Sequence, residues 1–386
     1  MNYKEEKLAD YIDILSGYAF KTKDFTDKGI PIIKIKNICP PYVSLDDLSF
    51  VSKETAALQK KFELTYDDVL IAMTGSHINQ WASVVGRVAR VKYNQKTLLN
   101  QRVGKITVKD NNKANIDYIY YFLSQDSIKI ELAAKAGGAA NQANISPTQI
   151  KDLYFPCPEI SKQNKIASIL RSYDDLIENN QKQIKLLEEA AQRLYKEWFV
   201  DLHFPGWEKT KIVDGVPEGW EKAVVTDLLT IKYGKDHKKL DDGDIPVYGS
   251  GGIMRRVKNV LYSGESVLIP RKGSLNNILY VSGDFWTIDT MFYSIPKKEN
   301  IAKYTYLFLR TLDMYSFNIG AAVPSMTTKI LDGIDIIYPK DDILNAFEAL
   351  LNPIYSKIQI LKLQIESSTQ ARDRLLPKLM SGEIEV

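Results

Sequence analysis

The chain has 386 residues, enough for two or three domains of ordinary size. Its 45% hydrophobic and 26% charged content excludes a mainly disordered chain, and a net charge of only +3 excludes a generic polyanion-coating protein. Two cysteines cannot build a disulfide framework, and three scattered histidines lack metal-ligand spacing. With no signal peptide and no apolar run of membrane-spanning length, we expect a reducing, cytoplasmic location.

The first part of the chain predicts short strands separated by turns. Runs of β-branched and aromatic residues bounded by Gly, Pro, Asn or Asp indicate strands at 30–38, 68–75 and 103–109. A short helix is expected at 118–132. A Gly/Ala-rich loop at 137–145 and a last strand at 153–158 follow.

A long helical pattern comes next, over about 161–199. Its apolar positions alternate at spacings of three and four, which predicts the seam of a coiled coil. Asn180 occupies a seam position, where a polar residue can set the register of paired helices. The predicted seam residues are Leu170, Tyr173, Ile177, Asn180, Ile184, Leu187, Ala191, Leu194 and Trp198.

The rest of the chain repeats this order. Strands are expected at 266–273 and 291–297, a helix at 304–315, a Gly/Ala-rich loop at 320–328 and a last strand at 334–339. A second heptad pattern follows, in which Pro353 and Pro377 predict a helix that begins near the first proline and frays near the second. Its apolar seam residues are Leu351, Ile354, Ile358, Leu361, Ile365, Leu375 and Leu379, interrupted by Ser368 and Arg372.

Direct sequence matches support an internal duplication. Residues 9–14 with Gly17 match residues 226–231 with Gly234, 30–32 match 245–247, and 68–71 match 266–269. The spacing between matched segments shrinks along the chain, so the first copy carries more inserted residues. We therefore predict an α+β fold with two β-rich domains, each followed by a long helix.

Two helices with similar seams in one chain predict that the helices pack against each other in antiparallel fashion. The alternative is that each amphipathic helix packs only on its own domain. Charge follows the same division, because residues 1–160 and 209–340 each carry a net charge of +3 and the remaining, mostly helical parts carry −3.

A search for catalytic motifs returns weak candidates only. Residues 352–355 resemble the Asn-Pro-Pro-Tyr motif of amino-methyltransferases, but they lie within the heptad pattern. Residues 248–252 are Gly-rich but lack the Lys-Ser/Thr of a phosphate-binding loop and are better interpreted as a turn. We therefore predict no catalytic residue, no metal site and no cofactor.

Polar residues with nucleic-acid-reading chemistry recur beside the matched Gly-Ser turns. Arginine can bind guanine and Asn or Gln can bind adenine in the major groove, while other cations hold phosphates. A solvated surface role is the alternative for each single residue. The candidates are Ser76, His77, Asn79, Gln80, Arg87, Arg90, Lys92, Arg102, Asn141, Gln142, Arg255, Arg256, Lys258, Arg271, Lys272, Ser274 and Asn276.

Two further features bear on these candidates. Gln101 and Arg102 align with Thr290 and Met291 of the second copy. The Gly/Ala-rich loops are either flexible connections or sites where the backbone approaches DNA closely. Since the candidate clusters recur at equivalent turns with different residues, they are typical of two readers of different sequences on one scaffold.

Several segments resemble the specificity (S) subunit of type I restriction-modification systems over nearly the whole chain. They include the Pro-Glu-Gly-Trp at 217–220, the Ile-Pro-Val-Tyr-Gly-Ser-Gly-Gly-Ile at 245–253, residues 191–201 and residues 374–384. Each is weak alone, but their order, twice over, is fairly specific. The first domain lacks the Pro-Glu-Gly-Trp lead-in, so its beginning differs.

The resemblance implies target-recognition domains at 1–160 and 224–340, helical regions at 161–202 and 341–386, and a linker at 203–223. In that family each recognition domain reads one half of a bipartite, asymmetric site in double-stranded DNA. The paired helices set the spacer and bind two modification subunits that methylate adenine, and restriction subunits join this core. The specificity subunit itself does no chemistry. A tandem protein-interaction scaffold without a DNA-reading role is the alternative function.

Overall fold

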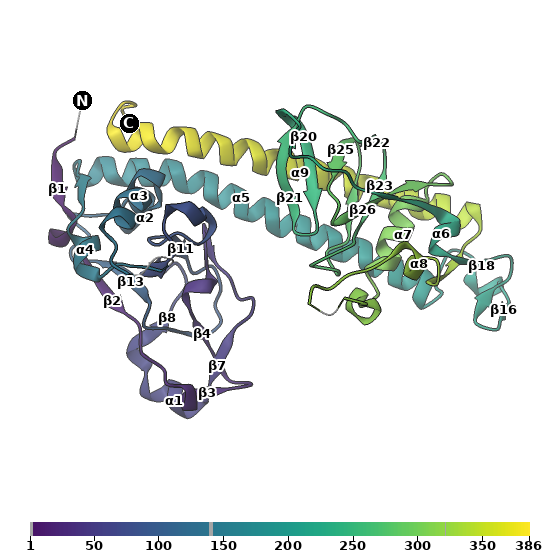
Figure 1. Cartoon of the computed structure of the whole chain (residues 1–386), viewed down its shortest axis with the longest axis horizontal. Coiled ribbons are helices and arrows are strands. Elements are labelled where there is room, and N and C mark those ends of the chain that lie inside the picture. The colour runs from purple at the N-terminus through teal and green to yellow at the C-terminus, as the bar shows by residue number, and fades with distance from the viewer. Residues whose placement is uncertain (1–2, 139–141, 321) are drawn as a thin grey trace. The chain divides into compact units, whose positions relative to one another are not determined.

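The computed structural model describes residues 3–138, 142–320 and 322–386. They form two compact units: unit 1 comprises Met1–Asn179 and Gln364–Val386, and unit 2 comprises Asn180–Leu363. Each unit contains a β-rich module and parts of two long helices, α5 (Ile160–Tyr195) and α9 (Asp341–Ser381) (Figure 1). We refer to residues 3–159 as module 1 and to residues 212–340 as module 2. The domain boundaries expected from the sequence remain a prediction.

Module 1 is built from short strands: β1 (Glu5–Lys7), β2 (Ile12–Ser16), β3 (Phe25–Thr26), β4 (Ile30–Ile33), β5 (Ile38–Cys39), β6 (Tyr42–Val43), β7 (Ser49–Val51), β8 (Glu63–Leu64), β9 (Val69–Ala72), β10 (Thr74–Gly75), β11 (Val88–Arg90), β12 (Thr97–Leu99), β13 (Val103–Val108), β14 (Ala143–Asn144) and β15 (Tyr154–Pro156). One sheet has the order β2-β13-β9-β11-β6-β5 and another the order β3-β7-β4-β12-β8. Two short pairs, β1–β15 and β10–β14, complete it.

The helices of module 1 are α1 (Lys53–Leu58), α2 (Ile116–Ser124), α3 (Asp126–Lys135) and α4 (Pro147–Lys151). The single helix predicted at 118–132 is wrong, because the extended backbone of Gln125 separates α2 from α3. The Gln125 side chain donates to the carbonyl of Phe122 at 3.2 Å and occupies one of the carbonyls left open where α2 ends.

The strands of module 2 are β16 (Ile212–Val213), β17 (Val216–Pro217), β18 (Glu221–Val224), β19 (Leu229–Tyr233), β20 (Asp242–Gly249), β21 (Gly252–Val257), β22 (Tyr262–Ser263), β23 (Ser266–Pro270), β24 (Leu279–Val281), β25 (Asp284–Thr287), β26 (Met291–Pro296) and β27 (Asp335–Tyr338). Its helices are α6 (Val225–Leu228), α7 (Ile301–Leu309) and α8 (Thr328–Leu331). The helix predicted at 304–315 is shorter and begins earlier; a separate 3-10 turn, Met314–Phe317, is capped by the Asp313 side chain.

The two modules share one topology, which confirms the predicted duplication and the α+β fold. The order β2-β13-β9-β11 recurs as β19-β26-β23-β24, and β7-β4-β12-β8 recurs as β21-β20-β25-β22. In both modules the second sheet contains one parallel pair, β4–β12 or β20–β25. The additional strands β5 and β6 and helix α1 lie between β4 and β8 and account for part of the extra residues expected in the first copy.

The long helices pack on each other within each unit. In unit 1, Ile166 and Leu170 near the start of α5 share a buried core with Leu379 and Met380 at the end of α9. In unit 2, Tyr195 at the end of α5 contacts Phe347 near the start of α9, with ring centroids 6.3 Å apart. The helices are therefore antiparallel, and the alternative in which each helix packs only on its own module is wrong.

The seam residues predicted from the heptads lie on the inner faces of these helices. Arg372, which interrupts the apolar pattern, pairs with Asp174 at 2.7 Å, and Ser368 is buried. The buried seam residues are Leu170, Ile177, Asn180, Ala191, Trp198, Leu351, Ile358, Leu361 and Leu379, and the partly buried ones are Tyr173, Ile184, Leu187, Leu194, Ile354, Ile365 and Leu375.

Neither proline bounds α9, contrary to the prediction. The helix begins at Asp341 and continues through Pro353 and Pro377 to Ser381. Both prolines are on the solvent face, as are Ala349 and Asp373, four residues before them. Water can therefore bind the carbonyls that proline leaves unpaired, while the buried opposite face holds the helix together.

Candidate nucleic-acid interface

In module 1 the Gly-Ser turn and the Gly/Ala-rich loop are joined by backbone pairing. Strand β10 pairs antiparallel with β14, with Gly75 opposite Ala143. The Thr74 hydroxyl donates to Asn144 Oδ1 at 2.7 Å, and the Ile145 N–H donates to the Met73 carbonyl at 3.0 Å. Two segments about 70 residues apart thus form one edge of the module.

Module 2 forms the same edge with different residues. Lys272 pairs antiparallel with Ser325, and the Met326 N–H donates to the Arg271 carbonyl at 2.8 Å. The Gly273 N–H also donates to the Pro324 carbonyl at 2.9 Å. We name these paired segments the turn–loop frame: residues 73–76 with 143–145 in module 1, and 271–274 with 324–326 in module 2.

The frame also corrects one detail of the sequence alignment. The Met73 N–H donates to the Arg102 carbonyl at 2.9 Å, and the Arg271 N–H donates to the Thr290 carbonyl at 2.8 Å. Arg102 is therefore equivalent to Thr290, one residue away from the Met291 match expected from the sequence. The shift arises because backbone pairing, rather than side-chain similarity, defines equivalence in a sheet.

A matched glycine makes the same close backbone approach in each module. At Gly17 an added Cβ would lie 2.3 Å from the Asn100 carbonyl oxygen, and at Gly234 it would lie 2.0 Å from the Ile288 carbonyl oxygen. Neither neighbour is a flexible side chain, so the backbone itself would have to move. The matched glycines of the two copies therefore permit the same close approach of two chain segments.

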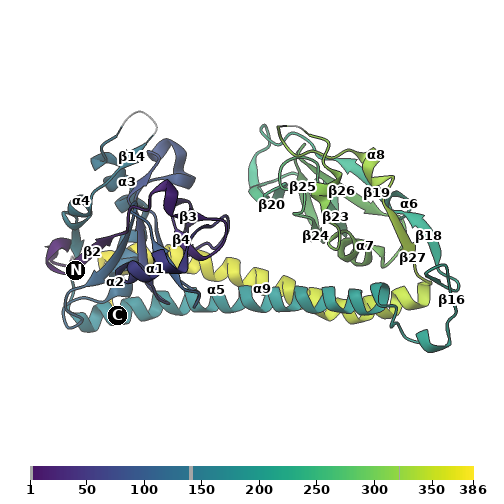
Figure 2. The ribbon, with the colours of Figure 1, turned by 90° about the horizontal axis from the view of Figure 1, so that it is seen from below.

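The candidate side chains that flank the frame of module 1 are mainly exposed amides. Asn79, Gln80, Arg102 and Gln142 are exposed and His77 is half-buried, whereas Asn141 lies outside the described residues. Ser76 is buried and its hydroxyl donates to the Gln80 carbonyl at 2.6 Å, so it shapes the turn instead of facing a ligand. Figure 2 shows β14 at the end of module 1 away from α5 and α9.

The side chains of Arg87, Arg90 and Lys92 are engaged by other groups of the protein. Arg87 donates to the carbonyls of Ala82 and Ile35, and its burial lowers the pKa of its guanidinium. Arg90 is only 3% exposed and pairs with Asp117 at 2.7 Å. These side chains support module 1 from within.

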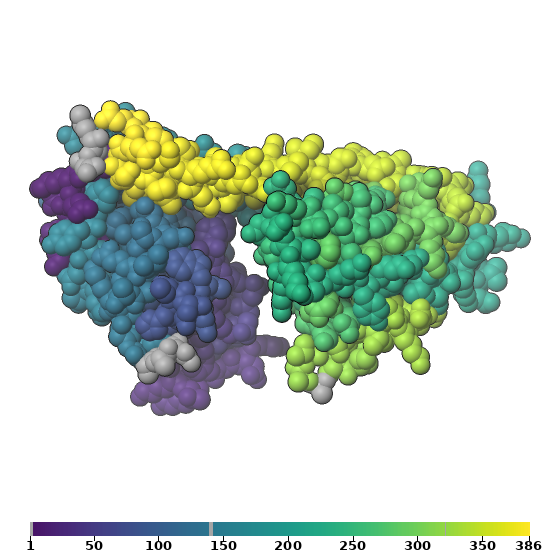
Figure 3. All heavy atoms as spheres, turned by 45° about the horizontal axis from the view of Figure 1, so that its top comes forward, coloured from purple at the N-terminus to yellow at the C-terminus, as the bar shows by residue number. Residues whose placement is uncertain are grey.

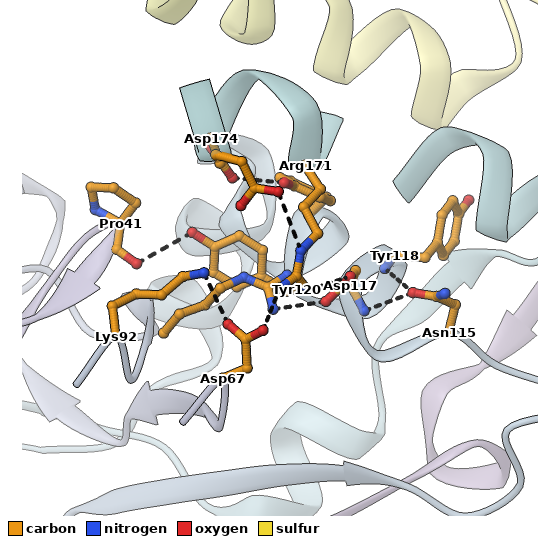
Figure 4. A network of polar contacts seen from close by, with 12 residues as sticks. Pro41, Asp67, Lys92, Asn115, Asp117, Tyr118, Tyr120, Arg171 and Asp174 are labelled. Carbon is orange, nitrogen blue, oxygen red and sulfur yellow. Dashed lines mark hydrogen bonds and ion pairs between the residues drawn. The ribbon is translucent and has the colours of Figure 1, made fainter. Parts of the chain in front are cut away.

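Arg90 and Lys92 belong to an ion-pair network between module 1 and α5, which we name the unit 1 joint (Figure 4). Arg171 of α5 donates to Asp67 and, at 2.8 Å, to Asp117. Lys92 lies 3.0 Å from Asp67 and 3.3 Å from Glu178. The unit 1 joint could not be predicted from the sequence, because the order of charged residues along the chain does not identify their ion-pair partners.

The network changes the acidity of its members. Burial raises the pKa of Asp67, but its bonds to Arg171 and Lys92 outweigh burial, so the net pKa lies below its ordinary value. Burial likewise lowers the pKa of Lys92, and the bond to Asp67 reverses that effect, leaving the pKa raised. Both groups are therefore held in their charged forms at neutral pH.

Module 2 is attached to α9 by a different, more aromatic joint. Lys303 of α7 donates to Glu265 at 2.8 Å and to Glu348 of α9 at 2.5 Å. The rings of Tyr280 and Tyr355 pack edge to face with centroids 4.9 Å apart, and Lys303 Nζ lies 5.2 Å and 5.9 Å from the two centroids. Burial raises the pKa of Glu348, partly offset by Lys303. Figure 3 shows the full chain as spheres, in which α9 is yellow to yellow-green.

The predicted basic cluster after the Gly-rich turn of module 2 is largely tied down. Arg255 donates to the Leu240 carbonyl at 3.0 Å and pairs with Asp242 at 2.5 Å. Arg256 donates to the Asp244 carbonyl at 2.7 Å. Lys258 is exposed. The two arginines thus hold the β20–β21 hairpin, and Lys258 faces solvent.

Arg271, Lys272 and Ser274 belong to the frame of module 2, and Asn276 follows it two residues later. Lys272 and Ser274 are exposed, and Arg271 is partly exposed. Asn276 accepts from the Met314 N–H at 2.7 Å, which ties the turn to the 3-10 segment. Two exposed tyrosines, Tyr233 and Tyr315, lie beside the same turn. Arg271 lies over the Tyr233 ring, and the Tyr315 hydroxyl donates to the Gly273 carbonyl at 3.5 Å. Neither tyrosine was among the candidates predicted from the sequence.

Among the residues that the structure describes, no group of three or more His, Cys, Asp and Glu side chains is placed to hold a metal ion. Across the same residues, no helix combines the length and apolar content needed to cross a bilayer.

Comparisons with known proteins give a consistent result. A family model described as the type I restriction modification DNA specificity domain matches residues 1–189 and 217–367. A type I restriction enzyme specificity subunit (MjaIX) of Methanocaldococcus jannaschii is 28% identical over 301 residues, covering 70% of this chain and 69% of the relative. A putative specificity subunit of a type I restriction enzyme (MjaX) from the same organism is 25% identical over 413 residues, covering 100% of this chain and 94% of the relative.

A solved structure shares the fold. The S subunit of a type I restriction-modification system from M. genitalium aligns with a TM-score of 0.60 at 18% identity, covering 98% of this chain and 96% of that chain. At this identity the likeness shows that the architecture is common to both proteins.

Proposed function

The chain belongs to the family of type I restriction-modification specificity subunits, and on that premise we propose that each module reads one half of a bipartite, asymmetric site in double-stranded DNA. The observation that carries the proposal is the turn–loop frame. Its backbone hydrogen bonds recur in both modules, while the side chains that it presents differ. One scaffold with two sets of side chains suits two different half-sites.

The chemistry at the frame matches base reading. Asn79, Gln80 and Gln142 present amides, which can bind adenine edges, and Arg102 and Arg271 present guanidinium groups, which can bind guanine. Lys258 and Lys272 are exposed cations suited to phosphate contacts. Arg90 and Lys92 leave the proposed contact set because the unit 1 joint holds them.

The helical parts supply spacing and assembly in this proposal. Their buried seams form a stiff antiparallel pair, and we assign to this pair the spacer length and the docking of two modification subunits that methylate adenine. Restriction subunits join the same core. The chain itself is a non-catalytic subunit that binds no cofactor and works in the cytoplasm. We retain the domain boundaries 1–160, 161–202, 203–223, 224–340 and 341–386 as part of the proposal.

The test is to insert one heptad into each long helix at the boundary between the units, after Asn179 and after Leu363. Seven helical residues add about 10.5 Å, so we expect a spacer that is longer by up to about 3 base pairs. Sequencing of methylated adenines, after co-expression with the modification subunits, returns both half-sites and the spacer together. A changed half-site would contradict the assignment of spacing to the helices.

The same experiment separates the alternative function. A tandem protein-interaction scaffold predicts that the chain purifies without modification subunits and that it retains no DNA at low salt. Adenine methylation at a bipartite site that depends on this chain would exclude the scaffold.

A further inference from the structure

Arg271 is the first residue of the turn segment in the module 2 frame. It follows β23 directly, its N–H donates to the Thr290 carbonyl at 2.8 Å, and its carbonyl accepts from the Met326 N–H at 2.8 Å. The backbone of Arg271 is thereby fixed to Thr290, the residue before β26, and to Met326 of the Gly/Ala-rich loop. The origin of the side chain is therefore rigid relative to the sheet, which a base-reading residue requires.

The guanidinium of Arg271 is held in place as well. Its Nη1 donates to the Asp289 carbonyl at 3.1 Å, and its Cζ lies 5.3 Å from the centroid of the Tyr233 ring. A guanidinium carries five N–H donors in one plane, so a single bond to a carbonyl leaves a planar fork for another acceptor pair. The bonded partner is a carbonyl, not a carboxylate, so this bond does not neutralise the positive charge.

Tyr233 provides a surface on which this fork can rest. It is the last residue of β19 and is 52% exposed. Its ring also packs edge-on against buried Phe292, with centroids 5.0 Å apart, which fixes the ring plane. A cation that stacks on a fixed aromatic face loses little further freedom when it binds a ligand.

Three other candidate side chains of module 2, those of Arg255, Arg256 and Asn276, are engaged by neighbouring groups. Arg255 and Arg256 support the hairpin, as described above. Asn276 Nδ2 and Oδ1 both have partners, Asp313 at 3.2 Å and the Met314 N–H at 2.7 Å. Arg271 therefore combines a fixed position, a planar donor fork and partial exposure at the frame.

The equivalent position in module 1 carries a different chemistry. Met73 makes the same two backbone hydrogen bonds as Arg271, but its side chain is buried in the core. Arg102 of module 1 is the backbone partner of Met73, and Thr290 occupies the equivalent position in module 2. Each module thus has one arginine in this hydrogen-bonded backbone pair, but the arginine is on the turn side in module 2 and on the opposite side in module 1.

We infer that Arg271 reads a guanine in the half-site of module 2 and that Tyr233 is its positioning residue. The inference deepens the proposed function and rests on it. Paired N–H groups of arginine match the O6 and N7 acceptors of guanine in the major groove, and a good bidentate contact typically discriminates strongly against other bases. Met73 has no such donors, so the two half-sites differ at the corresponding place.

The test uses the full chain co-expressed with the modification subunits and reads the methylated sites by sequencing. The variants are Arg271→Ala, Arg271→Lys, Tyr233→Ala and Tyr233→Phe. Lys222→Ala, which removes an exposed cation from β18 of the same module, is the matched control. We expect a G·C pair in the module 2 half-site that Arg271→Ala relaxes, with at least tenfold lower preference at that one position.

The positioning role predicts a graded result at the same base pair. Tyr233→Phe keeps the ring and should keep the guanine preference, whereas Tyr233→Ala should lower it about threefold or more without altering the other half-site. Lys222→Ala should leave every position unchanged. Each variant is measured by its base preference at every position of the target site. A general loss of protein stability would lower methylation at all positions and would not change the preference at a single base pair.

Each remaining outcome overturns part of the argument. A module 2 half-site that lacks a G·C pair, or one whose preference survives Arg271→Ala, refutes the guanine inference while the proposed function stands. Equal loss in Tyr233→Phe and Tyr233→Ala refutes the positioning role of the ring. If the wild-type chain directs no bipartite methylation, the proposed function fails and the inference fails with it.

Discussion

Arg171 connects α5 to module 1, and its replacement by alanine tests whether the unit 1 joint stabilises that unit. Arg171 makes hydrogen bonds to the carboxylates of Asp67 and Asp117, the latter at 2.8 Å. Charge-assisted hydrogen bonds contribute about 1.5–3 kcal/mol each, so the gross effect is about 3–6 kcal/mol. Lys92 and Arg90 remain paired with the two carboxylates, and the Arg171 side chain is 32% exposed to screening solvent. We therefore expect a net loss of about 2 kcal/mol.

Hydrogen exchange measures this loss locally. The amides of α2 and β9 should open roughly 30-fold more often in Arg171→Ala, while the amides of β23 and β26 in module 2 keep their protection. Arg193→Ala is the matched control, because its side chain is 83% exposed and lies 3.9 Å from Glu189. It should change exchange by less than about twofold.

A double-mutant cycle separates the ion pair from simple loss of packing. Arg171→Ala combined with Asp117→Asn should show a coupling energy of about 1 kcal/mol or more, because the two side chains share a hydrogen bond. Strictly additive effects, or equal acceleration of exchange in both modules, would refute the view that this network stabilises unit 1.

Two further outcomes follow from the geometry. Gly234→Ala should destabilise unit 2 by about 2 kcal/mol or more, because the new Cβ would lie 2.0 Å from the Ile288 carbonyl oxygen. Gly251→Ala is the control, because an added Cβ there would meet no atom within 4 Å. Urea unfolding measures both variants, and the control should leave the unfolding midpoint nearly unchanged. The pKa of Asp67 is lower in the folded protein than in the unfolded chain, where it is about 4. The contribution of Asp67 to the folding stability of unit 1 is therefore complete above about pH 4 and is lost as the pH falls through the folded-state pKa. Asp67→Asn should flatten the pH dependence of unit 1 stability below about pH 4, and an unchanged slope would contradict the assignment.

Much of the fold could be predicted because periodicity and composition report local burial. The β-rich runs, the two heptad seams and the duplication were all visible in the sequence, and the structure shows them. The matched glycines Gly17 and Gly234 were also informative, because both make the same close backbone approach. The single helix predicted at 118–132 was wrong at Gln125, where the backbone leaves the helical conformation. The prediction that Pro353 and Pro377 bound the second helix was also wrong, because helix propensity does not include the burial of the helix face opposite the prolines.

The candidate interface was predictable in composition but not in arrangement. The sequence analysis selected Arg90 and Arg271 for the same chemistry, yet one is buried against Asp117 and the other lies at the frame over Tyr233. Both residues are arginines, and local sequence does not reveal which long-range partner each one meets. Tyr233 was missed since a single aromatic residue at the end of a strand has no distinctive pattern.

The sequence by itself determined the two repeated modules, the heptad seams and the polar character of the turns, because these depend on residue spacing along a few turns or strands. Only the tertiary structure decided which turns and loops pair, which cations are neutralised within unit 1 and which arginine presents its donors at the frame. Those outcomes depend on hydrogen bonds and ion pairs between residues tens of positions apart, such as Met73 with Ile145 and Arg171 with Asp67. A polar side chain is available to a ligand only when the folded chain does not already satisfy it.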